Sequence, residues 1–246
     1  MKSTTPYDKS FYSIQSKSSY NSAREVVPLI LNLIQPNSIV DIGCGLGTWL
    51  KAFDELGVTD YIGVDGDYVK KDDLYIESSK FRINDISTTF ELNRVFDLAI
   101  SLEVGEHISE ENSDVFVENI CRHSKVVLFS AAIKFQGGTN HVNEQMQNYW
   151  VEKFMKLGYK ASDVIRNKIW LNTIIQPHYR QNIILFIHES VIDKFQNKIL
   201  EINGLDFCTS VVHPEVFMDK VDYKKQAVRN QFSFFLKVLS YRIFKK

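Results

Sequence analysis

The sequence predicts an α/β domain with a doubly wound, mostly parallel sheet, and two observations carry this prediction. Apolar runs of strand length alternate with helical patterns through the first three quarters of the chain, as expected of successive βα units. The first apolar run ends in a glycine-rich turn that leads into a helical pattern, and this turn reads Asp41-Ile42-Gly43-Cys44-Gly45-Leu46-Gly47. The 246 residues suffice for one large domain, or for one domain with an appendage.

The predicted strands are short runs rich in β-branched and aromatic residues. Five of them are separated by helical patterns or turns, and they cover residues 38–42, 61–64, 81–83, 96–102 and 125–130. Two later runs, at residues 163–170 and 182–188, follow each other without a helical pattern between them. This closeness predicts an antiparallel hairpin that closes one edge of the sheet.

The predicted helices cover residues 22–34, 48–56, 88–95, 110–121 and 145–157. Pro28 inside the first of them predicts a kink or a later start, because proline lacks the backbone N–H of a helix interior. We divide the chain into three parts. Residues 1–21 are a flexible or cap-forming segment, residues 22–190 the α/β domain, and residues 191–246 a helical C-terminal extension with helices over 191–201 and 228–244.

Charge and cysteine content exclude several classes of protein. A formal net charge of -1 gives no general attraction to nucleic acid. The three cysteines are widely spaced, which argues against a disulfide framework or a cysteine zinc site and suits a reducing compartment. No signal peptide or membrane-spanning run is visible, so the expected location is the cytoplasm.

The C-terminal extension is locally basic, with seven Lys or Arg and no acid from Lys224 to Lys246. Apolar side chains share one face of its last predicted helix. This face is expected to pack on the domain or on a partner subunit of a homo-oligomer. The alternative is a peripheral membrane contact that uses the basic residues.

The glycine-rich turn predicts a ligand site at a helix N-terminus. A dinucleotide fingerprint needs Gly-x-Gly-x-x-Gly, whereas the third glycine here is Gly47 and Thr48 follows. Asp41, before the first glycine, would repel a pyrophosphate. An acid at this position suits a cationic ligand such as the amino group of S-adenosylmethionine (SAM).

Two more acids follow at the ends of the next predicted strands, Asp65 and Asp85, at spacings of 24 and 20 residues. Asp65 is placed to accept hydrogen bonds from both ribose hydroxyls of a nucleoside. Asp85 is placed to accept from an adenine amino group, with the Ile86 N–H facing a ring nitrogen. Each acid alone also fits a helix cap or a turn.

This series resembles the successive motifs of class I SAM-dependent methyltransferases, in order and at normal spacing. The likeness extends from residue 22 to residue 189 and includes Phe96-Asp97-Leu98-Ala99-Ile100-Ser101-Leu102-Glu103. It implies a Rossmann-like sheet of seven strands with a reversed last hairpin. It also implies a SAM site at Asp41, Gly43, Cys44, Gly45, Gly47, Asp65, Gly66, Asn84, Asp85, Ile86, Leu102 and Glu103. The string from residue 22 to residue 145 is similar to methyltransferases of bacterial surface-polysaccharide gene clusters.

Candidate catalytic residues follow the fourth strand of this pattern. His107 is the first candidate base, because an imidazole titrates near neutral pH, and His141 is the second. Glu103, Glu106, His107 and His141 together offer two carboxylates and two imidazoles to a divalent metal ion. The Glu-x-x-Glu-His arrangement resembles that of metal-assisted methyltransferases acting on RNA 3′ ends and on quinone precursors, where the metal lowers the pKa of acceptor oxygens. The alternative is a histidine that satisfies a turn.

The polar segment 135–145 follows the fifth predicted strand and contains a pair of glycines, Gly137 and Gly138, near its start. It predicts a lid over the acceptor, and the residues expected to bind substrate are Asn143, Glu144, Gln145 and Tyr149. A capped helix start is the alternative. The leading functional interpretation is methyl transfer to an O or N of a small molecule, such as a sugar, a nucleotide-sugar or a capsule precursor. The alternatives are a metal-assisted RNA methyltransferase, disfavoured by the balanced charge, and a non-catalytic SAM-binding scaffold subunit.

Overall fold

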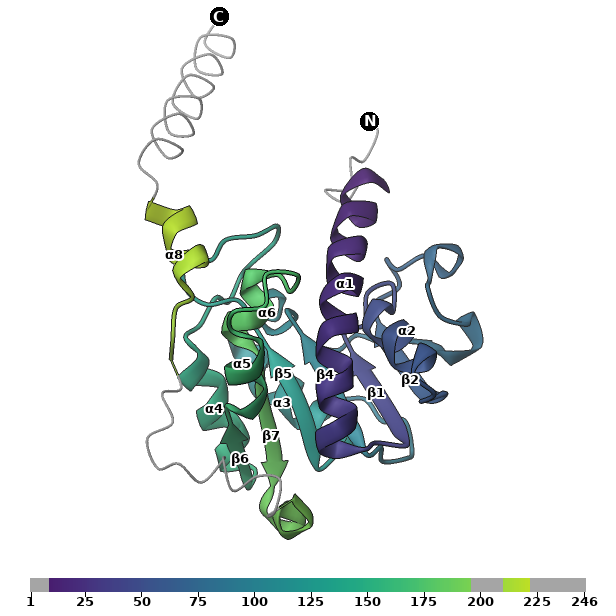
Figure 1. Cartoon of the computed structure of the whole chain (residues 1–246). Helices are drawn as coiled ribbons and strands as arrows, with labels where there is room; N and C mark the ends of the chain where they lie inside the picture. The colour runs from purple at the N-terminus through teal and green to yellow at the C-terminus, as the bar shows by residue number, and fades with distance from the viewer. Residues whose placement is uncertain (1–8, 196–209, 222–246) are drawn as a thin grey trace, which may run out of the picture. The chain divides into compact units, whose positions relative to one another are not determined.

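The computed structural model describes residues 9–195 and 210–221, and of residues 9–16 it describes only the backbone. Its centre is a sheet of seven strands in the order β3-β2-β1-β4-β5-β7-β6 (Figure 1). The strands are β1 (Ser38–Ile42), β2 (Asp60–Asp65), β3 (Phe81–Ile83), β4 (Leu98–Leu102), β5 (Val126–Ser130), β6 (Tyr159–Ser162) and β7 (Ile184–His188).

The pairing of these strands confirms the predicted sheet. The strands β3, β2, β1, β4 and β5 pair in parallel, whereas β7 pairs antiparallel to both β5 and β6. The chain progresses in opposite directions on the two sides of the β1–β4 pair. The carboxyl ends of β1 and β4 are therefore the switch point at which doubly wound sheets bind ligands.

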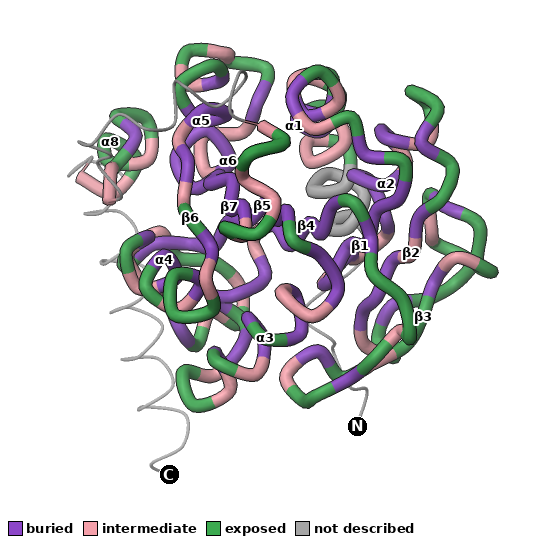
Figure 2. Tube along the Cα trace, turned by 90° about the horizontal axis from the view of Figure 1, so that it is seen from below, coloured by how far each residue is buried: buried purple, intermediate pink, exposed green. Residues whose placement is uncertain are grey.

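Helices cover both faces of the sheet. Central strands alternate their side chains between two cores, so Ile39 and Leu98 join one cluster while Val40 and Ala99 join the other. The tube is buried along the central strands and exposed toward the rim (Figure 2). The helices are α1 (Lys9–Ile34), α2 (Thr48–Glu55), α3 (Ser113–His123), α4 (Gln147–Lys156), α5 (Val164–Ile169) and α6 (Pro177–Asn182), with 3-10 turns at Lys71–Asp73, Ser78–Lys80, Gly105–His107, Glu110–Asn112 and Glu189–Phe195.

The predicted helix over residues 88–95 is wrong, because this segment is an extended loop. Two side chains of α3 supply the hydrogen bonds that a local helix would have made. The Phe90 N–H donates to Asn119 Oδ1 at 3.3 Å, and the Leu92 N–H donates to His123 Nε2 at 3.1 Å. Burial of Phe90 beneath α3 therefore overrides the local helical pattern.

The predicted strand over residues 163–170 is also wrong, since this segment forms α5. Arg166, buried in the core, pairs with Asp163 three residues earlier, an interaction that stabilises a helical turn. The sixth strand is instead β6. Because α5 and α6 lie between β6 and β7, these strands form an antiparallel pair without being a tight hairpin.

The first helix begins earlier than predicted, at Lys9 in place of residue 22, and Pro28 lies inside it. The chain divides into two units, residues 1–211 and 212–246. The second contains helix α8 (Pro214–Val221), and the predicted helix over 228–244 lies outside the described residues. No helix in the described ranges is long and apolar enough to cross a membrane.

Candidate functional site

The glycine-rich turn joins β1 to α2 at the carboxyl edge of the sheet. Gly43 has φ +85°, and a Cβ added there would lie 2.5 Å from the Val104 side chain, so only glycine fits. The Gly43 N–H donates to the Val64 carbonyl, which ties the turn to β2. Gly45 also has positive φ, at +52°, but nothing lies within 4 Å of its added Cβ. The turn is therefore packed at its base and open at Gly45, where a ligand can approach the backbone.

Two carboxylates lie beside this turn and are buried, Asp41 in β1 and Asp65 at the end of β2. The Gly45 N–H donates to Asp65 Oδ2 at 2.6 Å, and the Gly66 N–H donates to Oδ1 at 2.7 Å. The Tyr68 hydroxyl also donates to Oδ1. The predicted juxtaposition of the glycine turn with these acids is thus observed.

Burial raises the pKa of both carboxyls. For Asp41, desolvation is the larger cause and the neighbouring Asp65 charge the second. For Asp65, desolvation outweighs the hydrogen bonds from Tyr68, Gly45 and Gly66, which act in the opposite direction. Among the described residues, no lysine or arginine contributes to either shift. The one basic group that acts on either carboxyl in the described part of the chain is His107, whose charge lowers the pKa of Asp65, so this pair of buried acids favours a cationic ligand.

The third predicted acid has a different environment. Asp85 is exposed, and its Oδ1 accepts from the Ser87 N–H at 3.0 Å and from the Ser87 hydroxyl at 2.6 Å. This is the turn arrangement that an aspartate adopts locally. The neighbouring Asn84 N–H donates to the Asp65 carbonyl, and Ile86 is buried. The contact of Asp85 with an adenine therefore stays a prediction.

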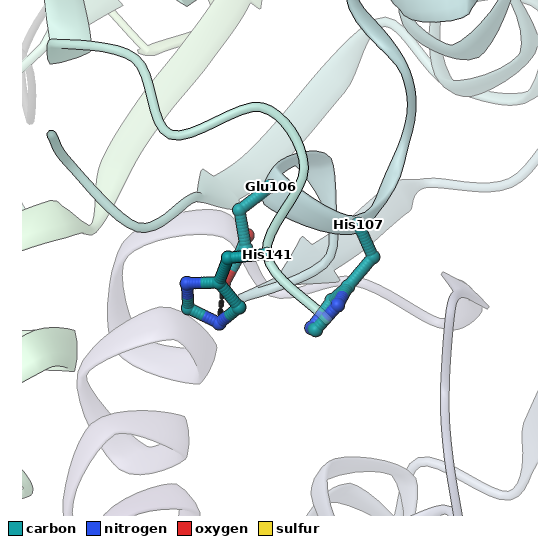
Figure 3. A group of neighbouring side chains, drawn as sticks. All are labelled: Glu106, His107 and His141. Carbon is teal, nitrogen blue, oxygen red and sulfur yellow. Dashed lines mark ion pairs between the residues drawn. The ribbon is translucent and has the colours of Figure 1, made fainter. Parts of the chain in front are cut away.

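Across the switch point, three predicted catalytic side chains meet. Glu106 and His107 come from the 3-10 turn after β4, and His141 comes from the loop after β5 (Figure 3). One ligand atom from each lies within 4.8 Å of the other two. The distance from His141 Nε2 to Glu106 Oε1 is 3.9 Å, and the two imidazole rings meet edge to face at 4.9 Å between centroids. This grouping joins segments that are more than thirty residues apart in the sequence.

Glu106 is the buried member of this trio, with 1% of its surface exposed. Burial raises its pKa well above the ordinary value, and the Glu103 charge adds to the shift. Its Oε2 is buried and makes no hydrogen bond in the structure. His107 lies at the exposed rim, and partial desolvation by the surrounding atoms lowers its pKa. At neutral pH His107 is therefore unprotonated and able to accept a proton.

Both histidines have a defined tautomer. His107 Nδ1 lies 3.2 Å from the Asn140 carbonyl, and His141 Nδ1 lies 2.8 Å from Glu144 Oε1. A carbonyl or carboxylate oxygen only accepts, so each Nδ1 carries the proton. In the neutral form of each ring, Nε2 then bears the lone pair that a base or a metal ligand requires.

The fourth predicted ligand, Glu103, lies outside this trio. It has φ +57° at the end of β4, and its two carboxylate oxygens accept from Gln136 Nε2 at 3.0 Å and Asn182 Nδ2 at 3.1 Å. Gln181 extends this network by donating to Gln136 Oε1 at 3.2 Å. Glu103 thus faces α6 and the loop after β5. Leu102, the other predicted contact from β4, is buried directly before it.

Three of the four predicted substrate residues, Asn143, Glu144 and Gln145, make hydrogen bonds in or around the loop after β5. Asn143 is buried and donates to the Ser113 hydroxyl at 3.0 Å, while Gln145 donates to Asn143 Oδ1. Tyr149 lies on α4 against Trp150. Glu144 bonds within its own loop. Contact of these residues with a substrate stays a prediction.

Sequence reasoning missed the polar residues of α6. Burial lowers the pKa of His178, and the Glu103 charge acts in the opposite direction. The buried Tyr179 hydroxyl lies 3.1 Å from Ser19 of α1, which itself lies 3.1 Å from the Thr48 hydroxyl at the start of α2. The one signal in the sequence was a polar run, residues 178–182, directly before an apolar strand.

Comparison with known proteins identifies this architecture. The sugar N-methyltransferase KedS8 from Streptoalloteichus sp ATCC 53650 superposes with a TM-score of 0.56 at 15% identity, covering 76% of this chain and 98% of that one. SAM-bound CalS10, an amino pentose methyltransferase from Micromonospora echinaspora, has a TM-score of 0.54 at 12% identity and coverages of 76% and 100%. The methyltransferase domain of the bacterial protein CtHen1-C has a TM-score of 0.51 at 18% identity and coverages of 68% and 97%. These likenesses concern the fold.

The sequence itself gives the family. No curated protein matches the chain. A family model described as a methyltransferase domain matches residues 15–163, which is more than half of the 246 residues. The matched range contains the glycine-rich turn, the buried acids and the Glu106, His107 and His141 trio. The chain therefore belongs to the methyltransferase domain family.

Proposed function

We propose that this chain transfers the methyl group of SAM to an oxygen or nitrogen of a saccharide-type small molecule. The observation that carries the proposal is the buried pair Asp41 and Asp65 beside the open glycine turn. SAM brings an ammonium and a sulfonium to this site, and both positive charges offset the desolvation of the two carboxylates. The ribose hydroxyls donate to Asp65. The adenine lies toward Asp85 and Ile86.

Methyl transfer from a sulfonium is an in-line displacement with a good leaving group, so the protein must chiefly align the acceptor and exclude water. The acceptor approaches from the side of Glu106, His107 and His141, which border the same switch point as the glycine turn. A neutral imidazole there removes the proton of a hydroxyl or amine. His107 is the first candidate because its pKa is lowered and its ring lies at the exposed rim.

The trio also fits a divalent metal ion. Two imidazole Nε2 atoms and one carboxylate are a common donor set for Mn²⁺, Fe²⁺, Co²⁺ or Zn²⁺. Glu106 Oε2, buried and without a hydrogen bond, is the orphaned acceptor that such an ion would satisfy. A bound ion would lower the pKa of neighbouring acceptor oxygens. In this proposal Glu106, His107 and His141 hold the ion, and Glu103 keeps its bonds to Gln136 and Asn182.

The acceptor class is inferred from the two groups that could activate it. A metal ion and a histidine base would both suit an acceptor with neighbouring polar groups. A sugar carries neighbouring hydroxyls, or a hydroxyl beside an amine. The fold likeness to a sugar N-methyltransferase and an amino pentose methyltransferase supports a saccharide. The narrower inference of a surface-polysaccharide or capsule precursor rests on the sequence string alone.

A second candidate is methylation of an RNA end, whose terminal ribose carries the same pair of hydroxyls. The trio and the fold likeness to CtHen1-C favour it. The net charge of -1 disfavours it, since RNA affinity depends mainly on basic surface.

One experiment separates these candidates. SAM binding is measured first by calorimetry, and then methyl transfer is followed by mass spectrometry against nucleotide-linked amino sugars, neutral sugars and short RNA with a free 3′ end. Each reaction is run after chelator treatment and again with added Mn²⁺. Methylation of a sugar supports the proposal, and methylation of RNA alone supports the second candidate. Absence of SAM binding overturns both, and binding without any transfer favours a scaffold subunit.

A further inference from the structure

The loop after β5 has an unusual backbone over residues 135–144. Phe135, Gly137 and Asn140 all have positive φ, at +69°, +69° and +59°. Phe135 is neither glycine nor asparagine, and the left-handed conformation costs such a residue about 1–2 kcal/mol. The loop therefore requires interactions that hold it in this form, and it carries His141.

Glu144 supplies these interactions. Its Oε2 accepts from the Phe135 N–H at 2.9 Å, and its Oε1 accepts from the Gly137 N–H at 2.5 Å. The same Oε1 accepts from His141 Nδ1 at 2.8 Å. One carboxylate thus closes the loop across nine residues and also holds the imidazole. The Glu144 side chain is one-fifth exposed (19%), so these charge-assisted bonds are partly shielded from water.

The surroundings of His141 restrict its ring further. A Cβ added to Gly138 would collide with His141 Nε2, so glycine at this position leaves the room that the ring occupies. The Val142 and Asn143 N–H groups donate to the Glu106 carbonyl at 2.9 and 3.0 Å. The loop is therefore docked on the turn that carries Glu106. With Nδ1 held by Glu144, His141 Nε2 lies 3.9 Å from Glu106 Oε1 (Figure 3).

We propose that Glu144 is a positioning residue that sets the tautomer and orientation of His141 in the acceptor site, rather than a substrate ligand. This inference rests on the proposed function only in giving His141 a role there. Histidines that ligate metals or act as bases commonly donate their other N–H to such a carboxylate, which fixes the ring and raises its basicity. Glu144 adds a second effect, because the bonds that orient the ring also close its loop.

The test compares Glu144→Ala and Glu144→Gln with the control Glu152→Ala, an exposed glutamate of α4. The ring nitrogens of His141 are observed by ¹⁵N NMR in metal-free protein, with His141→Gln used for assignment. The wild type and the control should show a protonated Nδ1. Glu144→Ala should show a mixture of tautomers, and Glu144→Gln, whose amide oxygen still accepts from Nδ1, should largely restore the wild-type pattern. An unchanged Nδ1–H tautomer in Glu144→Ala overturns the inference.

A second measurement uses Mn²⁺ alone. Its affinity for the wild type, measured by calorimetry, should fall about 10- to 100-fold in Glu144→Ala and remain unchanged in Glu152→Ala. If neither the wild type nor any variant binds Mn²⁺ but the tautomer changes, the inference is supported and Mn²⁺ is excluded as the ion of this site. If Glu144→Ala keeps both the tautomer and the Mn²⁺ affinity, the inference fails while the proposed methyl transfer stands. Thermal unfolding of each variant identifies a folding defect. If Glu144→Ala does not fold, Glu144→Leu, which keeps a similar side-chain volume but accepts no hydrogen bond, replaces it in both measurements.

Discussion

The sharpest prediction concerns Asp65, the carboxylate at the end of β2. An aspartate offers about four lone-pair positions. The Gly45 and Gly66 N–H groups use two of them, at 2.6 and 2.7 Å. A third is used by the Tyr68 hydroxyl, whose side chain is 66% exposed and can move away. Two positions thus become available for the two ribose hydroxyls of SAM.

The expected magnitude follows from this count. Two hydrogen bonds to a charged acceptor contribute about 1.5–3 kcal/mol each, and release of the Tyr68 hydroxyl offsets about 1–2 kcal/mol. Asp65→Asn removes the charge and half of the acceptor positions, so we expect a loss of about 2–4 kcal/mol. The Kd for SAM should therefore rise about 30- to 1000-fold. Burial raises the pKa of Asp65, so its negative charge lowers the stability of the folded protein. Removal of this charge should therefore not unfold the protein, and the loss of SAM affinity should reflect the lost interactions with SAM.

Isothermal titration calorimetry with SAM measures this change. Asp67→Asn is the matched control, because Asp67 is exposed two residues further along the chain. The control should bind like the wild type. The reasoning is refuted if Asp65→Asn binds SAM within about threefold of the wild type while thermal unfolding shows that it is folded.

Three further predictions address the same structure. Tyr68→Phe should tighten SAM binding about 5- to 30-fold, because its hydroxyl no longer competes for Asp65; unchanged or weaker binding by calorimetry contradicts this. Burial lowers the pKa of His123, so the contribution of this residue to stability is complete above about pH 6.5 and is lost as the pH falls through the lower pKa of the folded state. The thermal unfolding midpoint of His123→Phe should therefore depend less on pH than that of the wild type between about pH 7.5 and 5.5. An equal pH dependence refutes this prediction. Asn119→Ala should lower the free energy of unfolding by about 2–4 kcal/mol in denaturant titration, since Asn119 bonds three backbone groups of the loop over residues 86–96 and also the Arg122 side chain of α3. The exposed control Glu118→Ala should change it by less than about 0.5 kcal/mol.

The sequence predicted the structure best where a local pattern is compatible with a single conformation. The apolar run before Gly43 is β1, and Asp41, Asp65 and the glycine turn lie together as predicted. Parallel strands bring their carboxyl ends to one edge, so strand ends that are distant in the chain become neighbours. That rule also placed Glu106 and His107 on the same edge as the turn.

The errors have a common cause. The residues over 88–95 have a helical pattern, but Asn119 and His123 of α3 supply their hydrogen bonds. The run that forms α5 is apolar enough for a strand, but its buried Arg166 donates to the Gln181 carbonyl of α6 at 3.3 Å. In both places partners outside the segment decided its conformation, and periodicity within the segment carries no information about them.

By itself, the sequence determined the doubly wound sheet, the edge that carries the glycine turn and the buried acids, and the residue types proposed for the acceptor side. Only the tertiary structure selected which of those residues meet. It joined His141 to Glu106 and His107, turned Glu103 toward Gln136 and Asn182, and folded Asp85 onto Ser87. The physical reason is that strand order follows from patterns that repeat along the chain, whereas side-chain partners depend on loop conformation. Here one carboxylate, Glu144, closes that loop and orients the histidine.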